Sequence, residues 1–87
     1  MEHAIRAILD DVGGLVRPAD SLSTRDDLFV AGLTSFATVG VMLAIEEEFD
    51  VAFPDALLVR STFVSIDALS TAVASLKDGI EGSARAA

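Results

Sequence analysis

The sequence predicts an all-α protein, a small bundle of three main helices plus one short helix, with a long loop between the first and second main helices. Two stretches place apolar residues at helical spacing, and a third is apolar nearly all round. No useful length of chain alternates as a strand does. With 87 residues, 52% of them apolar, the chain can build one core. We expect a single domain over residues 1–78 and a flexible tail over residues 79–87.

The first helix is expected at the N-terminus. Its apolar residues recur at the i, i+3, i+4, i+7 spacing of a one-sided helix, and they are Ile5, Ile8, Leu9, Val12 and Leu15. Gly13 and Gly14 weaken the end of this helix, and Pro18 follows it.

Residues 17–33 form the predicted long loop, which begins with the turn-rich sequence RPADSLSTRDD. Four apolar side chains are expected to hold the loop on the core: Leu22, Leu28, Phe29 and Leu33. Asp26 and Asp27 are expected to help fix it. A loop of this length in a compact domain is often functional.

The second helix is expected to start at Thr34 or Ser35, either of which can cap it, and to run to about Phe49. Pro54 disfavours helix at Phe53, so residues 50–54 form a break, and residues 55–59 can make one short helical turn. Ser65 is a good cap for the last helix. The apolar face of that helix is Ile66, Leu69, Val73 and Leu76.

The second helix is apolar on two sides when its residues are placed about 100° apart. The natural core side holds Val41, Met42, Ile45 and Phe49, whereas Phe36, Val39 and Leu43 lie opposite, flanked by Gly40, Glu46 and Glu47. Such a helix is either fully buried or bound to something. Two interpretations stay open: the bundle covers both sides, or the second side meets partner proteins.

The charge distribution excludes several classes of partner. Fourteen acidic residues outnumber six basic ones, so the net charge of -8 repels nucleic acid and anionic lipid and would attract a basic protein surface. Eighteen uncharged residues, 28–45, reach the length of a membrane span, but their glycines and hydroxyls and the acidic flanks argue against membrane insertion. The N-terminus lacks the order of a secretory signal, so we expect a cytoplasmic protein.

Little material for catalysis is present. His3 is the single histidine and cysteine is absent, which leaves almost nothing for a Ser-His-Asp site or a structural zinc site. Glu46, Glu47, Glu48 and Asp50 are interpreted as a solvated helical face, since no loop has Ca²⁺-binding spacing. We expect no catalytic residue, no metal site and no enzyme activity.

One stretch, DDLFVAGLTSFATVGVMLAIEEEFDVAFPD, resembles the signature of the acyl and peptidyl carrier proteins. The shared features are the D-x-L-F-x-x-G-L lead-in, a serine opening the second helix, the E-E-E-F exit and the following P-D turn. In that family the serine receives the 4'-phosphopantetheine arm of coenzyme A, whose thiol then holds cargo as a thioester. The resemblance places the arm on Ser35, where a helix N-terminus suits a phosphodiester.

The resemblance also implies the partners. They are a phosphopantetheinyl transferase, a cargo-loading ligase or synthetase and a downstream acceptor enzyme. We expect the chain itself to be a monomer. The residues expected to bind partners are Thr34, Phe36, Val39, Gly40, Leu43, Glu46 and Glu47.

The chain departs from the family pattern around the serine. The usual Asp-Ser-Leu is here Thr34-Ser35-Phe36, and Ala37 and Gly40 stand where acidic residues are usual. This is typical of a specialised, stand-alone carrier, and we expect a short or polar cargo, with an aminoacyl group loaded by an ATP-dependent ligase as the leading hypothesis. Phe29, Phe53 and Phe63 could fill the core space that a long chain needs.

Two alternatives stay open. The chain could be a fatty-acyl or polyketide carrier, or it could be a helical protein-interaction module in which Ser35 is unmodified. The second alternative differs from any carrier at the hydroxyl of Ser35.

Overall fold

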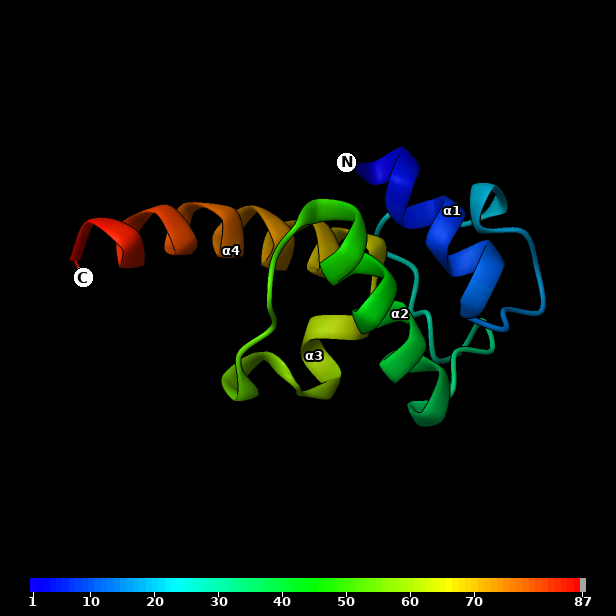
Figure 1. The fold of residues 1–87 in the computed structure, drawn as a ribbon. Helices are drawn as coiled ribbons and strands as arrows, with labels where there is room; N and C mark the ends of the chain where they lie inside the picture. The colour runs from blue at the N-terminus through cyan, green and yellow to red at the C-terminus, as the bar shows by residue number, and fades with distance from the viewer. Residues whose placement is uncertain (87) are drawn as a thin grey trace.

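The computed structural model describes the backbone of residues 1–86 and the side chains of residues 1–78. Its helices are α1 (Glu2–Val12), α2 (Ser35–Phe49), the short α3 (Arg60–Phe63) and α4 (Ile66–Ala86), with 3₁₀ turns η1 (Ala19–Ser21) and η2 (Asp55–Leu57). No strand occurs in the described backbone, so the predicted all-α class is confirmed. In Figure 1, α4 reaches away from the other helices. The helical backbone continues to Ala86, and the predicted flexibility of residues 79–87 stays a prediction.

The core gathers one side from each main helix. α1 contributes Ile5 and Leu9, α2 contributes Val41 and Ile45, and α4 contributes the predicted face of Ile66, Leu69 and Val73, all of them fully buried, with Leu76 packed at its edge. Ser65 caps α4 as predicted, because its Oγ accepts a hydrogen bond from the Ala68 N–H at 3.0 Å. These contacts hold α2 by one side only.

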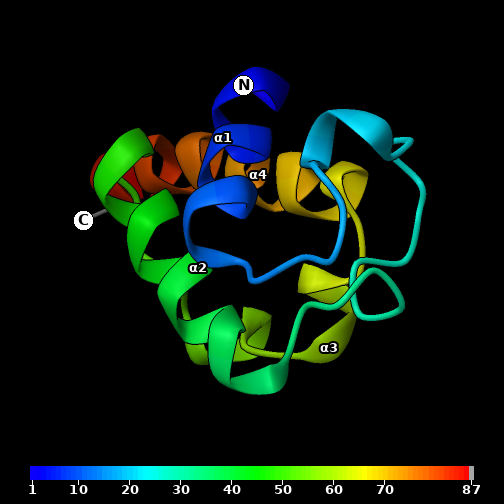
Figure 2. The same cartoon turned by 90° about the vertical axis from the view of Figure 1, so that its right-hand side faces the viewer.

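The long loop is fixed at several points, and Figure 2 shows it passing α4 and α3 before it reaches α2. Leu22, Leu28 and Leu33 are buried, as predicted. The Leu28 N–H donates to the Val64 carbonyl at 2.7 Å, and the Asp67 N–H donates to the Thr24 carbonyl at 2.9 Å. A loop tied to α3 and α4 in this way gives the start of α2 a defined position.

The last residues of the loop lie close to the segment that follows α1. The Val16 N–H donates to the Ala31 carbonyl at 2.9 Å, and Gly32 adopts φ +116°, where side chains are rarely accommodated. A Cβ on Gly32 would lie 3.0 Å from the Val16 nitrogen. Glycine is therefore required where the chain turns into α2.

The connection between α2 and α4 differs from the prediction of a single short turn over residues 55–59. The 3₁₀ turn ends at Leu57, and a separate helix, α3, follows over Arg60–Phe63. This four-residue helix has no side-chain cap. It is held by tertiary packing instead, since Thr62 and Phe63 are buried and the Phe63 ring stacks on Phe53 with centroids 5.8 Å apart.

Candidate functional site

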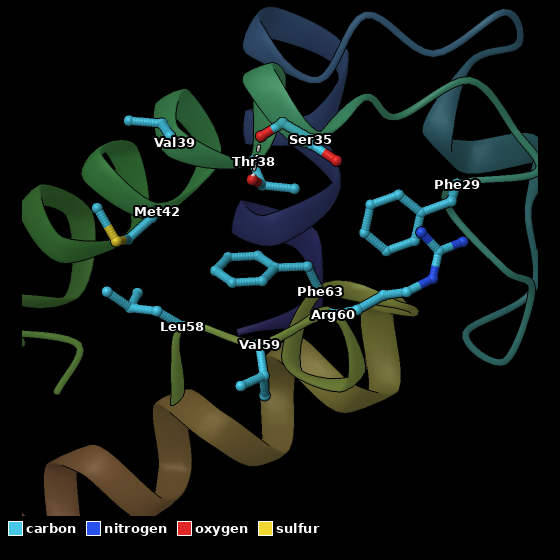
Figure 3. A pocket seen from close by; sticks show the side chains of 9 residues that line it. All are labelled: Phe29, Ser35, Thr38, Val39, Met42, Leu58, Val59, Arg60 and Phe63. Carbon is cyan, nitrogen blue, oxygen red and sulfur yellow. Dashed lines mark hydrogen bonds between the residues drawn. The ribbon is translucent and has the colours of Figure 1, made fainter. Parts of the chain in front are cut away.

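At the start of α2, one residue caps the helix and the next presents a hydroxyl group. Thr34 is the N-cap, and its Oγ1 accepts a hydrogen bond from the Ala37 N–H at 3.0 Å. Ser35 is the first helical residue and is exposed. Its carbonyl accepts from Thr38 Oγ1 at 2.5 Å, as Figure 3 shows, whereas its Oγ forms no hydrogen bond with the described side chains and backbone. The Ser35 hydroxyl is thus left free for another group.

The two sides of α2 have very different exposure. Val41 and Ile45 are fully buried and Met42 and Phe49 pack beside them, which confirms the predicted core side. Opposite them, Phe36 is 90% exposed, Val39 52% and Leu43 54%. The described part of the bundle does not cover this second side, which removes the interpretation that both sides are buried. We call Phe36, Val39 and Leu43 the outer face of α2.

Two of the residues expected beside the outer face are engaged within the fold. Glu46 is half-buried, and its Oε2 accepts a hydrogen bond from the Phe53 N–H at 2.7 Å, which ties the chain after α2 back to the helix. A Cβ on Gly40 would lie 3.8 Å from the Val12 Cβ, so Gly40 faces α1. Glu47 is exposed. The internal contact occupies the Glu46 carboxylate and leaves the Glu47 carboxylate accessible.

A pocket of about 330 Å³ opens beside Ser35, and Figure 3 shows its lining. α2 supplies Ser35, Thr38, Val39 and Met42, and the loop supplies Phe29. Leu58 and Val59 come from the segment before α3, and Arg60 and Phe63 come from α3 itself. Phe29, Phe53 and Phe63 all pack on the core as predicted. Phe29 and Phe63 also line the pocket, where the Arg60 guanidinium lies over the Phe29 ring. The aromatic rings therefore do not fill all of the space beside α2.

Thr38 and the residues from Leu58 to Arg60 were not predicted to be part of this region. Leu58 and Val59 are an exposed apolar pair, 46% and 47% accessible, and that pairing is the signal that could have pointed to the pocket. Arg60 gave no such signal, because its place beside Phe29 depends on how the loop and α3 pack.

Two further observations concern metal binding and membrane insertion. Among the described residues, no group of three or more His, Asp or Glu side chains lies close enough together to hold a metal ion. No helix there combines the length and apolar character needed to cross a membrane.

Comparison with known proteins adds the family. The family model for the phosphopantetheine attachment site matches residues 3–73. A curated relative from Agrobacterium fabrum (strain C58), an aminoacyl carrier protein, is 48% identical over 81 residues, which span 93% of this chain and 98% of the relative.

Solved structures agree. A carrier protein from Agrobacterium tumefaciens, crystallised with an engineered Bradyrhizobium japonicum glycine:[carrier protein] ligase and AMP, is 49% identical with a TM-score of 0.81, over 84% of this chain and 97% of that one. A solution structure from the same organism is 48% identical with a TM-score of 0.75, over 94% and 99%. The sequence signature, the helical bundle and these similarities agree, and the chain belongs to the phosphopantetheine-binding carrier protein family.

Proposed function

We propose that this chain is an aminoacyl carrier protein, in which Ser35 takes a 4'-phosphopantetheine arm from coenzyme A and the arm's thiol holds an amino acid as a thioester. The main observation behind this proposal is the exposed Ser35 hydroxyl. It does not cap the helix, because Thr34 is the N-cap. The backbone at the start of α2 suits the arm's phosphate, since a helix N-terminus favours an anion. The first turn of α2 also holds no acidic residue that would repel it.

The chain supplies the acceptor hydroxyl, and the transferase must supply the catalytic base. None of the nine described residues that line the pocket beside Ser35 is a histidine, a carboxylate or a lysine. His3 is exposed in the first turn of α1, a different element. We therefore propose a carrier without enzyme activity of its own, modified by a phosphopantetheinyl transferase.

The outer face of α2 is the proposed docking surface for the loading ligase and for the acceptor enzyme that takes the cargo. It lies on the same helix as Ser35, so a partner bound there stands close to the root of the arm. Exposed apolar side chains of this size are typical of protein interfaces. The relative crystallised with a glycine:[carrier protein] ligase supports a ligase as one of these partners. A cytoplasmic location and a monomeric state stay predictions.

The proposed cargo is an amino acid activated with ATP, as the aminoacyl carrier relative and the ligase complexes with AMP and ATP suggest. A fatty-acyl or polyketide carrier is the second candidate. The observation that favours it is the pocket beside Ser35, whose lining is mostly apolar and could receive a hydrocarbon chain.

A loading assay tests the amino acid cargo. The chain is first converted to its arm-bearing form with coenzyme A and a transferase, and then incubated with glycine, ATP and the Bradyrhizobium ligase. We expect intact-mass spectrometry to show one glycyl group on the wild type and none on Ser35→Ala. The Agrobacterium carrier is the positive control. An arm-bearing wild type that stays unloaded while the control is loaded would count against this cargo.

A melting experiment separates the two kinds of cargo. A medium-length fatty acyl chain that enters the pocket should raise the melting temperature, because apolar area leaves water at about 25 cal/mol per Å² before costs. A glycyl group should leave the melting temperature nearly unchanged. Stabilisation by the fatty acyl chain but not by the glycyl group would favour a fatty-acyl carrier over an aminoacyl carrier.

A further inference from the structure

Arg60 is the charged residue of the pocket beside Ser35. The other eight described lining residues are apolar or carry a hydroxyl group, so the guanidinium sets the electrostatic character of this hollow. Ser35 on α2 and Arg60 on α3 both line the pocket, and Figure 3 shows the Arg60 side chain directed toward Phe29. A cation placed at this point is unusual in a chain of net charge -8 with six basic residues.

The orientation of Arg60 is set by an aromatic ring rather than by an ion pair. The guanidinium carbon lies 3.9 Å from the centroid of the Phe29 ring, close enough for a cation–π contact. The Phe29 backbone N–H donates to Asp27 Oδ1 at 2.8 Å, and the Phe29 side chain packs against the core. Among the side chains described, the ion pair within 4.0 Å is that of Arg6 with Glu2, so Arg60 pairs with none of those carboxylates.

This arrangement leaves the edge of the guanidinium available to an anion. The contact with Phe29 occupies one side of the guanidinium and uses none of its N–H donors. Arginine binds phosphate oxygens through those donors. Once Ser35 carries the arm, the phosphorus is bonded to Oγ, and a phosphodiester with one negative charge stands at the pocket that Arg60 lines.

We propose that Arg60 is a positioning residue for the arm, whose guanidinium donates hydrogen bonds to the phosphodiester oxygens on Ser35. This rests on the proposed function. The contact fixes the direction in which the arm leaves α2, and it offsets the repulsion that a further negative charge meets on an acidic chain. Phe29 acts through Arg60, by holding the guanidinium plane in place.

Phosphorus NMR of the arm-bearing protein tests this directly, because the phosphodiester is the only phosphorus present. We expect Arg60→Gln to move the ³¹P resonance toward its position in the urea-unfolded protein, and Arg60→Lys to move it less, because lysine keeps the charge but not the fork of donors. Arg25→Gln is the matched control, since Arg25 is exposed and does not line the pocket, and its resonance should coincide with that of the wild type.

Melting temperatures supply a second measurement, arranged as a double-mutant cycle. Its two changes are attachment of the arm and loss of the guanidinium in Arg60→Gln. The change in melting temperature on adding the arm should be lower in Arg60→Gln than in the wild type by about 1–5 °C, the range for an exposed charge pair in a domain of this size. Arg25→Gln should show no such difference.

The outcomes separate this inference from the function on which it rests. An arm that attaches, with a ³¹P resonance unmoved by Arg60→Gln, overturns the role of Arg60 and leaves the carrier function intact. A resonance unmoved together with a raised KM for the ligase assigns Arg60 to the partner surface instead, and also overturns it. A wild-type chain that never gains the mass of the arm overturns both.

Discussion

The two sides of α2 use the same kinds of residue for different purposes. Val41 and Ile45 are fully buried in the core, whereas Val39 and Leu43, neighbours on the same helix, are about half exposed, and Phe36 is almost completely exposed. Burial of the first pair removes apolar area from water and stabilises the fold. The outer face gains little of that stabilisation. We therefore attribute its apolar character to the proposed binding of partners.

The size of the protein makes the asymmetry understandable. A small domain has a large surface for its volume, so the described helices cover one side of α2 and leave the other to solvent. The outer face adjoins Ser35 at one end and the exposed Glu47 at the other. We expect a partner to cover this face only while it loads or unloads the arm.

The largest effect should come from the buried side. Ile45→Ala removes a fully buried side chain and should lower the free energy of unfolding by about 2–5 kcal/mol. Leu43→Ala, the matched truncation on the outer face, should change it by less than about 0.5 kcal/mol. Urea denaturation followed by circular dichroism measures both. Equal losses in the two variants would mean that the sides do not differ as described.

The next effect should appear in loading rather than in stability. Leu43→Asp should weaken loading by the cognate ligase by about 1 kcal/mol or more in kcat/KM, as expected for a residue central to an interface. Val30→Asp places the same charge on an exposed valine outside α2 and should load normally. Because the outer face is apolar, raised salt should slow loading only weakly. If loading depended steeply on salt and Leu43→Asp left kcat/KM unchanged, the proposed role of the outer face would be wrong.

The smallest effect concerns the start of the helix. Thr34→Ala removes the cap and should cost about 1 kcal/mol of stability. Ser35→Ala should change stability by less than about 0.5 kcal/mol, because the Ser35 hydroxyl makes no hydrogen bond with the described residues. Thermal melts of the unmodified proteins compare the two. A larger loss in Ser35→Ala would show that its hydroxyl supports the fold.

Much of the fold was predictable from local patterns. Ile5 and Leu9 lie on the predicted face of α1, Ser65 caps α4, and Leu22, Leu28 and Leu33 of the loop are buried. Periodicity, capping chemistry and turn residues are local signals. The two sides of α2 followed from helical geometry alone. The attachment serine came from the resemblance, since a serine at a helix start carries little information by itself.

The rest depends on tertiary contacts that no local pattern carries. α3 is four residues long and is held by the packing of Phe63, so its sequence shows no helical period. Glu46 reads as one of three surface glutamates, yet its carboxylate binds the Phe53 N–H seven residues later. The pocket beside Ser35 exists only because the loop and α3 meet at Phe29 and Arg60.

The most direct test of the central claim is the intact mass of the chain after co-expression with a broad-specificity phosphopantetheinyl transferase. We expect the wild type to gain one phosphopantetheine group and Ser35→Ala to gain none while keeping the helical circular dichroism of the wild type. Thr38→Ala, which changes a second hydroxyl at the same pocket, should still gain the arm. An alanine variant at position 35 that acquires the arm's mass would contradict the claim. So would a wild type that stays unmodified while the Agrobacterium carrier is modified under the same conditions.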